Sequence, residues 1–445
     1  MRKSLTLLVV VVSGLALRAQ ESPGLWTLQD CIDYAIENNI ALKRQEVLRD
    51  QYRYDLKEQK AGILPSLNFE TNAYLNYGRS VSPEDNIITF EPNFNNSYGI
   101  SSGVTLFNGF AKSNRISAAR FLYKMGQEEV ETQKNLLSLD IVNAYYQLLM
   151  ARGLEESAVE QVEVTGKQLA RIKLLVETGK ESKTTFYELQ SQLSSDRLLL
   201  TQAHNNSMLA LESLRNLLQI EPGVAFDVAS ESDLPVVITE EMVDADSVYH
   251  IAKTLLPGIR ALEYKTMARE KELAVYRGLK TPAVNFFAGW RTAYFNALSE
   301  GVDPVPFSEQ VRNNNNPYFG INLSIPIFNR WANQRNVKRA KLNLEDSNLE
   351  MEQEYNDLYR QVTTACLELS ASRDEYLAAK DNLEFNTVSY DAVEKKLTVG
   401  LANATEYAEA RRQYFSAEIN MLRTQLQYNL KMITLRFYQT GDWNF

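Results

Sequence analysis

The chain of 445 residues is 44% hydrophobic and 23% charged, a composition typical of an ordered protein with a substantial core. Its formal net charge of −9 argues against nucleic acid and anionic lipid surfaces as partners. The sequence has only two histidines and no HExxH, GxSxG or glycine-rich phosphate-binding motif, so we predict no enzymatic activity, no metal site and no cofactor.

The first 19 residues have the pattern of a secretory signal peptide. Arg2 and Lys3 precede an apolar stretch from Leu5 to Leu17. We expect cleavage by signal peptidase after the small residue Ala19. An uncleaved anchor is the alternative, but the apolar run is short for a spanning helix. The predicted mature sequence offers no second transmembrane helix, so we expect any insertion into a membrane to use strands.

The two cysteines leave one question open. Neither directly follows the predicted cleavage site, which gives no support to a lipid-anchored amino terminus. Cys31 and Cys366 lie far apart in the sequence. A disulfide between them is chemically permitted after export, while two separate packing residues are the more common arrangement.

The sequence contains an internal duplication. The segment Phe107-Asn108-Gly109-Phe110-Ala111 returns 221 residues later as Phe328-Asn329-Arg330-Trp331-Ala332, and Gly179 returns as Gly400. Upstream, Pro65-Ser66-Leu67-Asn68-Phe69 matches Pro282-Ala283-Val284-Asn285-Phe286 at a shift of 217. The matched segments occur in the same order in both halves, at shifts of 217 and then 221, which argues against chance similarity. The difference of four places a four-residue insertion between the two sets of matched segments.

Each half of the sequence reads helix, strand, strand, very long helix, turn and helix. We predict a first repeat at 20–220, an equatorial connector at 221–247 and a second repeat at 248–445. The first helix is expected to begin at Thr27, which forms a capping box with Asp30, and to continue to about residue 60.

Four segments alternate apolar and polar residues with the period of a strand. They lie near 67–77, 98–107, 284–294 and 318–327, and their lengths suit tilted transmembrane strands. The polar stretches near 78–97 and 296–316 are predicted to be exposed loops. A half-buried sheet in a soluble domain is the alternative interpretation of the strands.

Two uninterrupted helical segments follow the strands, at about 110–178 and 330–398, and each would extend about 100 Å. A heptad row runs through both repeats, from Ile141 to Val176 and from Val362 to Leu397. A companion row that includes Ala365 and Ser372 is smaller and more polar. Heptads predict coiled-coil packing, with either close contact of small side chains or one wetted side.

A transmembrane barrel must close, because unpaired strand edges in hydrocarbon leave backbone groups unsatisfied. Four strands per chain are too few, since the smallest ordinary barrels need about eight. The barrel must therefore be shared between copies of the chain. Two chains would supply 8 strands and three would supply 12, and the physical argument permits either number.

This layout resembles that of the TolC-like outer membrane efflux proteins. The resemblance covers nearly all of the mature chain, including the opening Thr27-Leu28-Gln29-Asp30. Its most specific motifs are two helix-hairpin turns, Val176-Glu177-Thr178-Gly179 and Thr398-Val399-Gly400-Leu401. The fold class that it implies is mainly α with a transmembrane β-barrel portion, built from a duplicated repeat with four barrel strands per chain and a trimeric α-helical tunnel.

The resemblance also implies a function, a location and partners. It indicates an outer-membrane channel of a Gram-negative bacterium with a long periplasmic portion, serving tripartite efflux or type I secretion. The implied partners are two further copies of the chain, a periplasmic adaptor protein, an inner-membrane pump and outer-membrane lipid. The adaptor would contact the hairpin turns at Gly179, Val399, Gly400 and Leu401.

The family resemblance implies an acidic ring at the periplasmic mouth. Glu406 and Glu409 lie six and nine residues after Gly400 and would share one helix face, with Glu188 as a first-repeat addition. Such rings favour cations. The alternative is that these glutamates are ordinary solvated surface residues.

One departure from the family pattern concerns closure of the mouth. Relatives hold it shut with an aspartate, a tyrosine and an arginine, and the matching positions here are Thr185, Leu397 and Ala402. These residues cannot make that polar lock. Apolar packing of Leu397 and Val399 is one alternative.

The sequence leaves two other classes of function as alternatives. A periplasmic coiled-coil scaffold would use the strands as a small soluble sheet and would transport nothing. An enzyme acting on envelope substrates would need acidic pairs at catalytic spacing, which the sequence does not show. The cargo, the adaptor and the pump are not specified by these residues.

Overall fold

The computed structural model describes residues 25–81, 87–221, 223–229, 243–298, 305–399 and 401–443, so the predicted signal peptide lies outside the described residues. The chain forms two compact units. The hairpin unit comprises Met1–Ile40, Lys134–Ala245 and Thr364–Phe445, and the sheet unit comprises Ala41–Gln133 and Asp246–Thr363. Each unit therefore takes segments from both sequence repeats.

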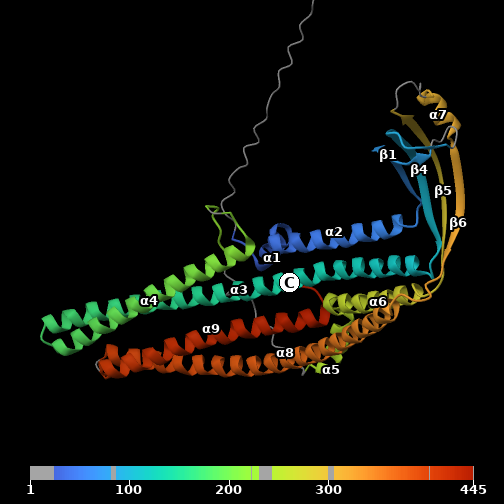
Figure 1. Cartoon of the computed structure of the whole chain (residues 1–445). Coiled ribbons are helices and arrows are strands. Elements are labelled where there is room, and N and C mark those ends of the chain that lie inside the picture. The colour runs from blue at the N-terminus through green and yellow to red at the C-terminus, as the bar shows by residue number, and fades with distance from the viewer. Residues whose placement is uncertain are drawn as a thin grey trace, which may run out of the picture. The chain divides into compact units, whose positions relative to one another are not determined.

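The order of elements repeats along the chain (Figure 1). The first half contains α1 (Leu28–Asn38), α2 (Ile40–Ala61), β1 (Ser66–Asn76), β2 (Ser80–Val81), β3 (Ile88–Thr89), β4 (Asn93–Phe107), α3 (Ala111–Glu177) and α4 (Lys183–Leu218). The second half contains α5 (Ala245–Leu255), α6 (Pro257–Gly278), β5 (Ala283–Ala297), α7 (Phe307–Asn313), β6 (Asn316–Ser324), α8 (Ala332–Thr398) and α9 (Ala404–Thr440).

The element lengths carry the duplication. Helices α2 and α6 both have 22 residues and begin at residues 40 and 257, which are 217 apart. Helices α3 and α8 both have 67 residues and begin at residues 111 and 332, which are 221 apart. The predicted duplicated fold is confirmed, and the offset changes between these helix pairs. Within the ranges described, none of the helices combines the length and the apolar character needed to cross a membrane.

The predicted single first helix is two helices, because the chain leaves the helical conformation at Asn39 (φ −62°, ψ 126°). The expected capping box between Thr27 and Asp30 does form. At the break, the Asn39 side chain donates to the Leu217 carbonyl, and the Ile40 N–H donates to Gln219 Oε1 at 3.0 Å. The second repeat has the same break at Leu256, where Pro257 disfavours a helical preceding residue.

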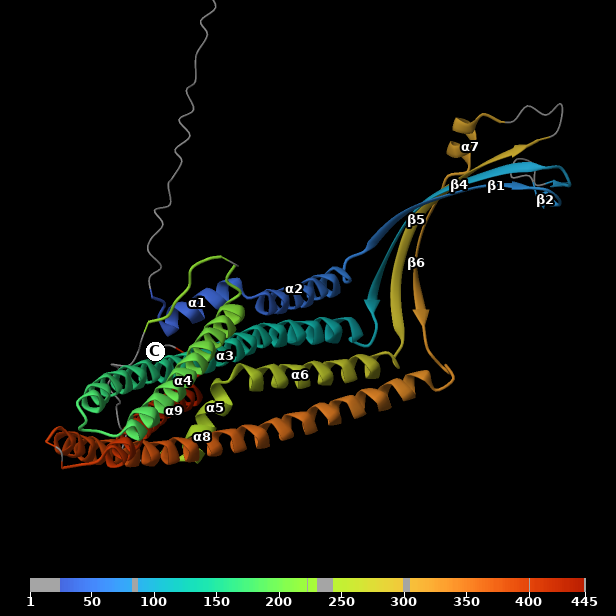
Figure 2. The same cartoon turned by 90° about the vertical axis from the view of Figure 1, so that its left-hand side faces the viewer.

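Four long strands lie side by side in an antiparallel sheet of order β1-β4-β5-β6 (Figure 2). Residues paired across strands share one face of a sheet. The register pairs Phe69 with Ile100, and Ile100 with Trp290, on an apolar face. The opposite face carries Asn, Ser and Gly, as in the row that pairs Asn68 with Ser101. Alternation in the sequence therefore corresponds to two chemically different faces.

Two glycines on the polar face are covered by aromatic rings from the neighbouring strand. In the register of β5 with β6, Gly289 is opposite Tyr318 and Phe287 is opposite Gly320. A Cβ on Gly289 would lie 2.5 Å from the Tyr318 ring, and one on Gly320 would lie 2.7 Å from the Phe287 ring. Each ring fills the space that its glycine leaves, which ties β6 to β5 in a single register.

The stretch near 296–316 is not simply the exposed loop that the sequence predicts, because α7 packs on β5. The Gln310 side chain is 3% exposed and bonds both the N–H and the carbonyl of Phe295. Thr292 Oγ1 donates to the Val311 carbonyl at 2.8 Å. An amide side chain that satisfies strand backbone groups has no periodic signal, so the element was missed. The stretch near 78–97 likewise contains β2, β3 and the start of β4.

The core of the hairpin unit gathers around α1, α3, α4 and the carboxyl end of α9. Tyr145, Ile141 and Leu148 of α3 are fully buried there, together with Cys31 and Trp443. The two cysteines are not joined by a disulfide; Cys31 is buried, and Cys366 is half-buried. Burial of residues from both predicted heptad rows, including Val362, Ala365 and Ser372, shows that small side chains pack closely on α8.

Candidate functional site

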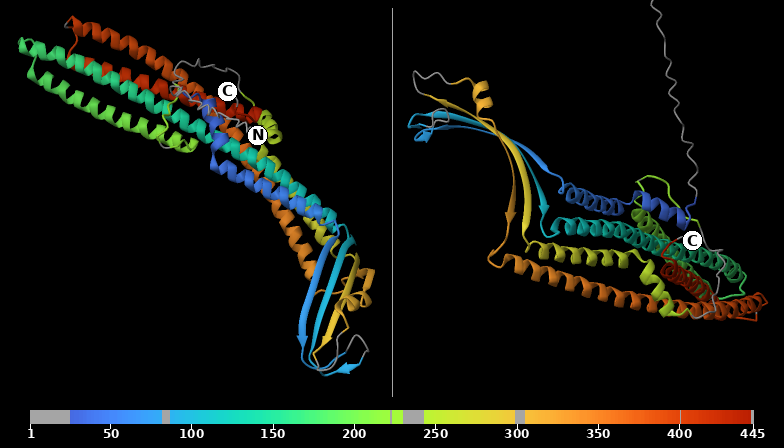
Figure 3. Two further views of the ribbon diagram at one scale, coloured as in Figure 1. Left: turned by 90° about the horizontal axis from the view of Figure 1, so that it is seen from above. Right: turned by 90° about the vertical axis from the view of Figure 1, so that its right-hand side faces the viewer.

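Both hairpins, α3–α4 and α8–α9, end at the same side of the hairpin unit (Figure 3). The first tip, residues 178–182, turns at Gly179 in the left-handed conformation (φ +74°), which a residue with a Cβ adopts only with strain. The Lys180 N–H donates to the Leu175 carbonyl at 2.8 Å and closes the end of α3. Ser182 then caps α4 by accepting from the Thr185 N–H at 3.1 Å.

The second tip, residues 399–403, repeats this pattern of bonds 221 residues later. The Leu401 N–H donates to the Lys396 carbonyl at 2.8 Å. Gly400 lies outside the described residues, whereas Val399 and Leu401 on either side are 67% and 78% exposed. Two large apolar side chains at an exposed turn are available to a partner. The structure thus presents two of the residues predicted to contact the adaptor.

The structure gives Glu406 and Glu409 different roles in the first turns of α9. Both side chains are exposed. Glu406 completes a capping box, because its N–H donates to Asn403 Oδ1 at 2.8 Å and its carboxylate accepts from the Asn403 N–H. Glu409 accepts from Arg412 Nη2 at 2.7 Å and from Gln413 Nε2 at 2.8 Å. These hydrogen bonds hold the pKa of Glu409 below its usual value, with Arg412 the larger cause.

Arg412 is a residue that the sequence reasoning missed, although the spacing of three between Glu409 and Arg412 is an ordinary signal for a helix ion pair. Its charge offsets that of Glu409. The Glu406 carboxylate instead accepts a hydrogen bond from the neutral Asn403 N–H. Glu188 is exposed on α4, on the other hairpin.

The three positions expected to lack the family's polar lock make local contacts. Thr185 is engaged in the cap of α4, with its hydroxyl 3.1 Å from Ser182 Oγ. Leu397 lies in the last turn of α8 and is half-buried, and Ala402 lies in the second tip.

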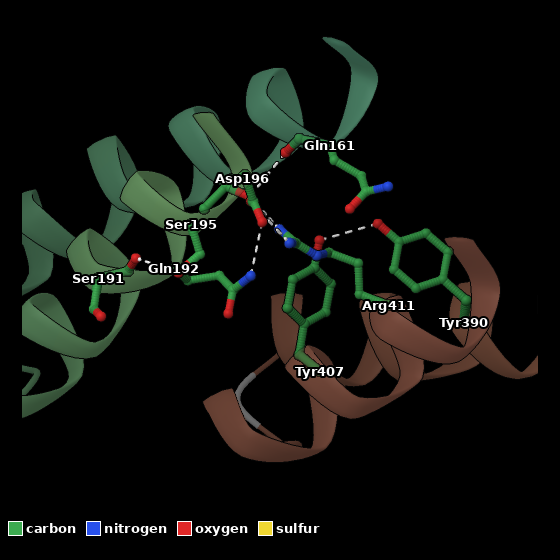
Figure 4. Close-up of polar contacts among 9 residues, drawn as sticks. Gln161, Ser191, Gln192, Ser195, Asp196, Tyr390, Tyr407 and Arg411 are labelled. Atoms are coloured by element: carbon green, nitrogen blue, oxygen red, sulfur yellow. Dashed lines mark hydrogen bonds and ion pairs between the residues drawn. The ribbon is translucent and has the colours of Figure 1, made fainter. Parts of the chain in front are cut away.

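A buried polar cluster instead joins the two hairpins further from the tips (Figure 4). Asp196 of α4 accepts from Arg411 Nη2 of α9 at 3.1 Å and from Gln192 Nε2 at 2.7 Å. Thr165 of α3 contacts both Asp196 and Arg411 through its hydroxyl. Thr165 is 0%, Asp196 4% and Arg411 6% exposed. Sequence patterns do not predict this cluster, because residues as far apart in the chain as Thr165 and Arg411, 246 positions, carry no local signal of their contact.

Tyrosines form a second group beside this cluster. The hydroxyls of Tyr390 on α8 and Tyr407 on α9 lie 3.0 Å apart, and the Tyr390 ring stacks on Tyr414 with centroids 5.2 Å apart. Burial raises the pKa of Tyr390, and it raises that of Tyr414 to about 12. Both hydroxyls are therefore neutral at physiological pH and act in hydrogen bonding.

Glu418 lines a cavity of about 270 Å³ between α3 and α9, together with Glu156 and Glu160 of α3. Glu418 accepts from Ser157 Oγ and from the Tyr414 hydroxyl, both at 3.3 Å. Burial, followed by the nearby charge of Glu160, raises the pKa of Glu418. Among the residues that the structure describes, no group of three or more His, Cys, Asp or Glu side chains could hold a metal ion.

The fold is duplicated: each half of the chain supplies one antiparallel helical hairpin and two of the four long strands of the sheet. The sequence profile of the outer membrane efflux protein family matches residues 31–218 and 248–439, and the chain belongs to this family. It is an outer-membrane transport protein of a Gram-negative bacterium, which confirms the predicted family and location.

Individual relatives are distant but cover nearly the whole chain. Outer membrane efflux protein BepC of Brucella suis is 18% identical over 426 residues, spanning 95% of this chain and 87% of the relative. Protein CyaE of Bordetella pertussis is 22% identical, spanning 88% and 79%. Crystal structures of CusC match with a TM-score of 0.78 at 19% identity, covering 93% of this chain and 92% of CusC. The structural match confirms the fold class.

Proposed function

We propose that this chain is the outer-membrane channel of a tripartite efflux or type I secretion system. Three copies would form one closed barrel of twelve strands and a helical tunnel. The tunnel would accept cargo from a periplasmic adaptor and an inner-membrane pump. Within the proposed channel, residues 20–220 and 248–445 are the two repeats, and 221–247 is the equatorial connector.

The observation that carries this proposal is the exposed apolar face of the sheet. Leu67 and Phe69 of β1 are 76% and 63% exposed, and Phe319 and Ile321 of β6 are 83% and 67% exposed. Such a face is costly in water but suits lipid, while the Asn- and Ser-rich face suits an aqueous lumen. β1 and β6 form the two edges of the four-stranded sheet and are the strands that neighbouring copies would pair with.

The connector proposal is supported by the contacts of its described part. Trp26 and Val228 form a parallel bridge, and the Trp26 N–H donates to the Asp227 carbonyl at 3.0 Å. Arg152 of α3 donates to the Val228 carbonyl at 3.0 Å and forms an ion pair with Asp227. These bonds attach the segment between the repeats to the amino-terminal end of the chain and to α3.

The test begins with membrane fractionation followed by gel electrophoresis of heated and unheated samples. We expect the protein in the outer-membrane fraction, migrating as a trimer until heated, and forming ion-conducting pores in planar bilayers. The alternative function is a periplasmic coiled-coil scaffold. A heat-insensitive monomer in the soluble periplasmic fraction would favour the scaffold and reject the channel.

We further propose that Glu406, Glu409 and Glu188 line the periplasmic mouth and favour cations. The exposed side chains of Glu406 and Glu409 on the first turns of α9 support this role. Gly179, Val399, Gly400 and Leu401 would contact the adaptor. The exposure of Val399 and Leu401 at the second tip supports that part. Reversal potentials across a salt gradient test the acidic ring, and adaptor crosslinking at the tips tests the contact.

A further inference from the structure

We propose that Arg411 is a positioning residue: held by Asp196 and Thr165, it fixes the rotation of α9 about its own axis and thereby keeps Glu406 and Glu409 on the exposed side of that helix. The inference rests on the proposed function, because it concerns how the mouth glutamates are oriented. It assigns a role to a buried ion pair that the channel architecture alone does not require.

Thr165, Gln192, Asp196 and Arg411 form one buried cluster, which we call the clamp. Its members come from α3, α4 and α9, so its bonds join both helices of the first hairpin to one helix of the second. Figure 4 shows the Arg411 side chain directed toward Asp196. The planar guanidinium presents donors in a fixed fork, which restrains direction as well as distance.

Breaking the ion pair between Arg411 and Asp196 would cost free energy, because both side chains are buried. The Arg411 and Asp196 side chains are 8% and 4% exposed. Breaking a buried pair leaves an uncompensated charge in a medium of low polarity, which is strongly unfavourable. The two buried charges therefore stay paired.

Helix periodicity sets the directions of Glu406 and Glu409 relative to Arg411. Successive residues on a helix are about 100° apart, so Glu409 lies about 160° from Arg411 and Glu406 about 140° from it in the other direction. The two glutamates therefore bracket the direction opposite to the clamp. The burial pattern agrees: Tyr407 and Phe415, one turn on either side of Arg411, are each 4% exposed, while Glu406 and Glu409 are exposed.

The buried contacts of the clamp therefore set the direction in which the exposed residues of α9 point. Apolar packing is non-directional, and the other polar contacts of α9 with α3, from Ser157 to Glu418 and from Gln168 to Tyr407, are longer, at 3.3 and 3.4 Å. A charged fork with partners on two helices has one favourable orientation. The neighbouring Arg412, exposed and paired with Glu409, changes local charge but does not connect the hairpins.

The decisive experiment measures the orientation of α9 directly in the assembled protein. Cysteines at exposed Ser194 of α4 and Ser416 of α9 would carry spin labels, in a C366S background where the remaining Cys31 is 0% exposed. Electron–electron resonance gives the distance distribution between the labels. We expect one narrow distribution for the unmodified clamp, a broad one for R411M, an intermediate one for R411K, and a narrow one again for the apolar pair D196L/R411M.

The matched control is R412M, which removes the adjacent arginine and should leave the distribution narrow. Cation preference in planar bilayers is the second readout: R411M should lower it toward the value of E406Q/E409Q, and D196L/R411M should restore it. A distribution as narrow in R411M and R411K as in the unmodified protein would overturn the clamp. If the unmodified channel shows no cation preference, the acidic ring fails as part of the proposed function, while the distance measurement still decides the role of Arg411.

Discussion

The two hairpin tips share a backbone and differ in chemistry. Both close their first helix with a bond from one N–H to a carbonyl five residues earlier, at Lys180 and at Leu401. The first tip then caps with Ser182 and Thr185, whereas the second caps with Asn403 and Glu406. The two tips therefore share the turn, but a carboxylate takes part in the helix cap only at the second tip.

The clamp shows the same divergence inside the bundle. At an offset of 221, the position equivalent to Arg411 is Gln190, and the position equivalent to Asp196 is Ala417. Neither repeat alone carries both the arginine and the aspartate at these positions. The ion pair therefore combines an aspartate from the first repeat with an arginine from the second, and the repeat-equivalent pair of Gln190 and Ala417 cannot form one.

The largest expected effect breaks the symmetry of the tips. Gly400→Glu should abolish export while the proposed trimer remains in the membrane, because a bulky charge would occupy the proposed adaptor contact. Gly179→Glu is the matched change at the first tip, where the left-handed turn adds strain of about 1–2 kcal/mol. Export assays with heat-modifiability gels measure both. Normal export by Gly400→Glu at normal expression would contradict the contact.

The next effect tests the interior difference. Asp196→Leu leaves Arg411 buried without its carboxylate, so the free energy of unfolding should fall by about 3–5 kcal/mol. The control is Gln190→Met, at the repeat position of Arg411, which is exposed and should change stability by less than about 0.5 kcal/mol. Denaturant titration in detergent compares them. Equal effects would show that the clamp adds no stability.

A smaller effect concerns selectivity at the second tip. Because Arg412 offsets Glu409, we expect Glu406→Gln to lower cation preference more than Glu409→Gln does. Arg412→Gln should raise cation preference by freeing Glu409. Reversal potentials across a salt gradient measure all three variants. An unchanged reversal potential in the double variant Glu406→Gln, Glu409→Gln would remove the lining role.

The helix caps offer a comparison of similar size at both tips. Ser182→Ala and Asn403→Ala should each cost about 1 kcal/mol of stability. Asn403→Ala should cost more of the two, because its capping box also uses Glu406. Thermal dissociation of the trimer measures the difference. A larger loss of stability from Ser182→Ala would contradict this order and indicate that the cap at the first tip contributes more to stability.

The smallest effect depends on pH. Because the pKa of Glu418 is raised in the folded protein, its contribution to stability is present at low pH and is lost as pH rises through that folded value. Glu418→Gln should therefore raise the melting temperature at pH 8 and change it little at pH 4. Arg197→Gln, at the equivalent exposed position of the first repeat, is the control. A stabilisation independent of pH would point to packing instead.

Periodicity made much of this fold predictable. The offsets of 217 and 221, the long helices, the alternating strands and the capping box of Thr27 all follow from local or repeating patterns. The break at Asn39 did not, because its bonds go to Leu217 and Gln219 in a distant helix. The role of Gln310 was hidden for the same reason, since a glutamine side chain gives no sign of which strand it will bond.

The site was predictable only in part. The tip glycines and the acids after them stand at family positions, so sequence could propose them. Whether Glu409 is charged alone or paired with Arg412 depends on rotamers, and the Asp196–Arg411 pair depends on the crossing of helices. Such contacts are set by tertiary packing, which residue spacing within one helix does not encode.

The aromatic rings over Gly289 and Gly320 have a consequence for assembly. A slip of β6 by one residue would turn its apolar side chains toward the polar face and would also drive each ring against a side chain where it now meets a glycine. The error would be penalised within a single chain, before any second copy is present. When β6 is in the correct register, the sheet offers a neighbouring copy only one complementary edge. Correct strand pairing between copies therefore depends on correct strand register within each chain.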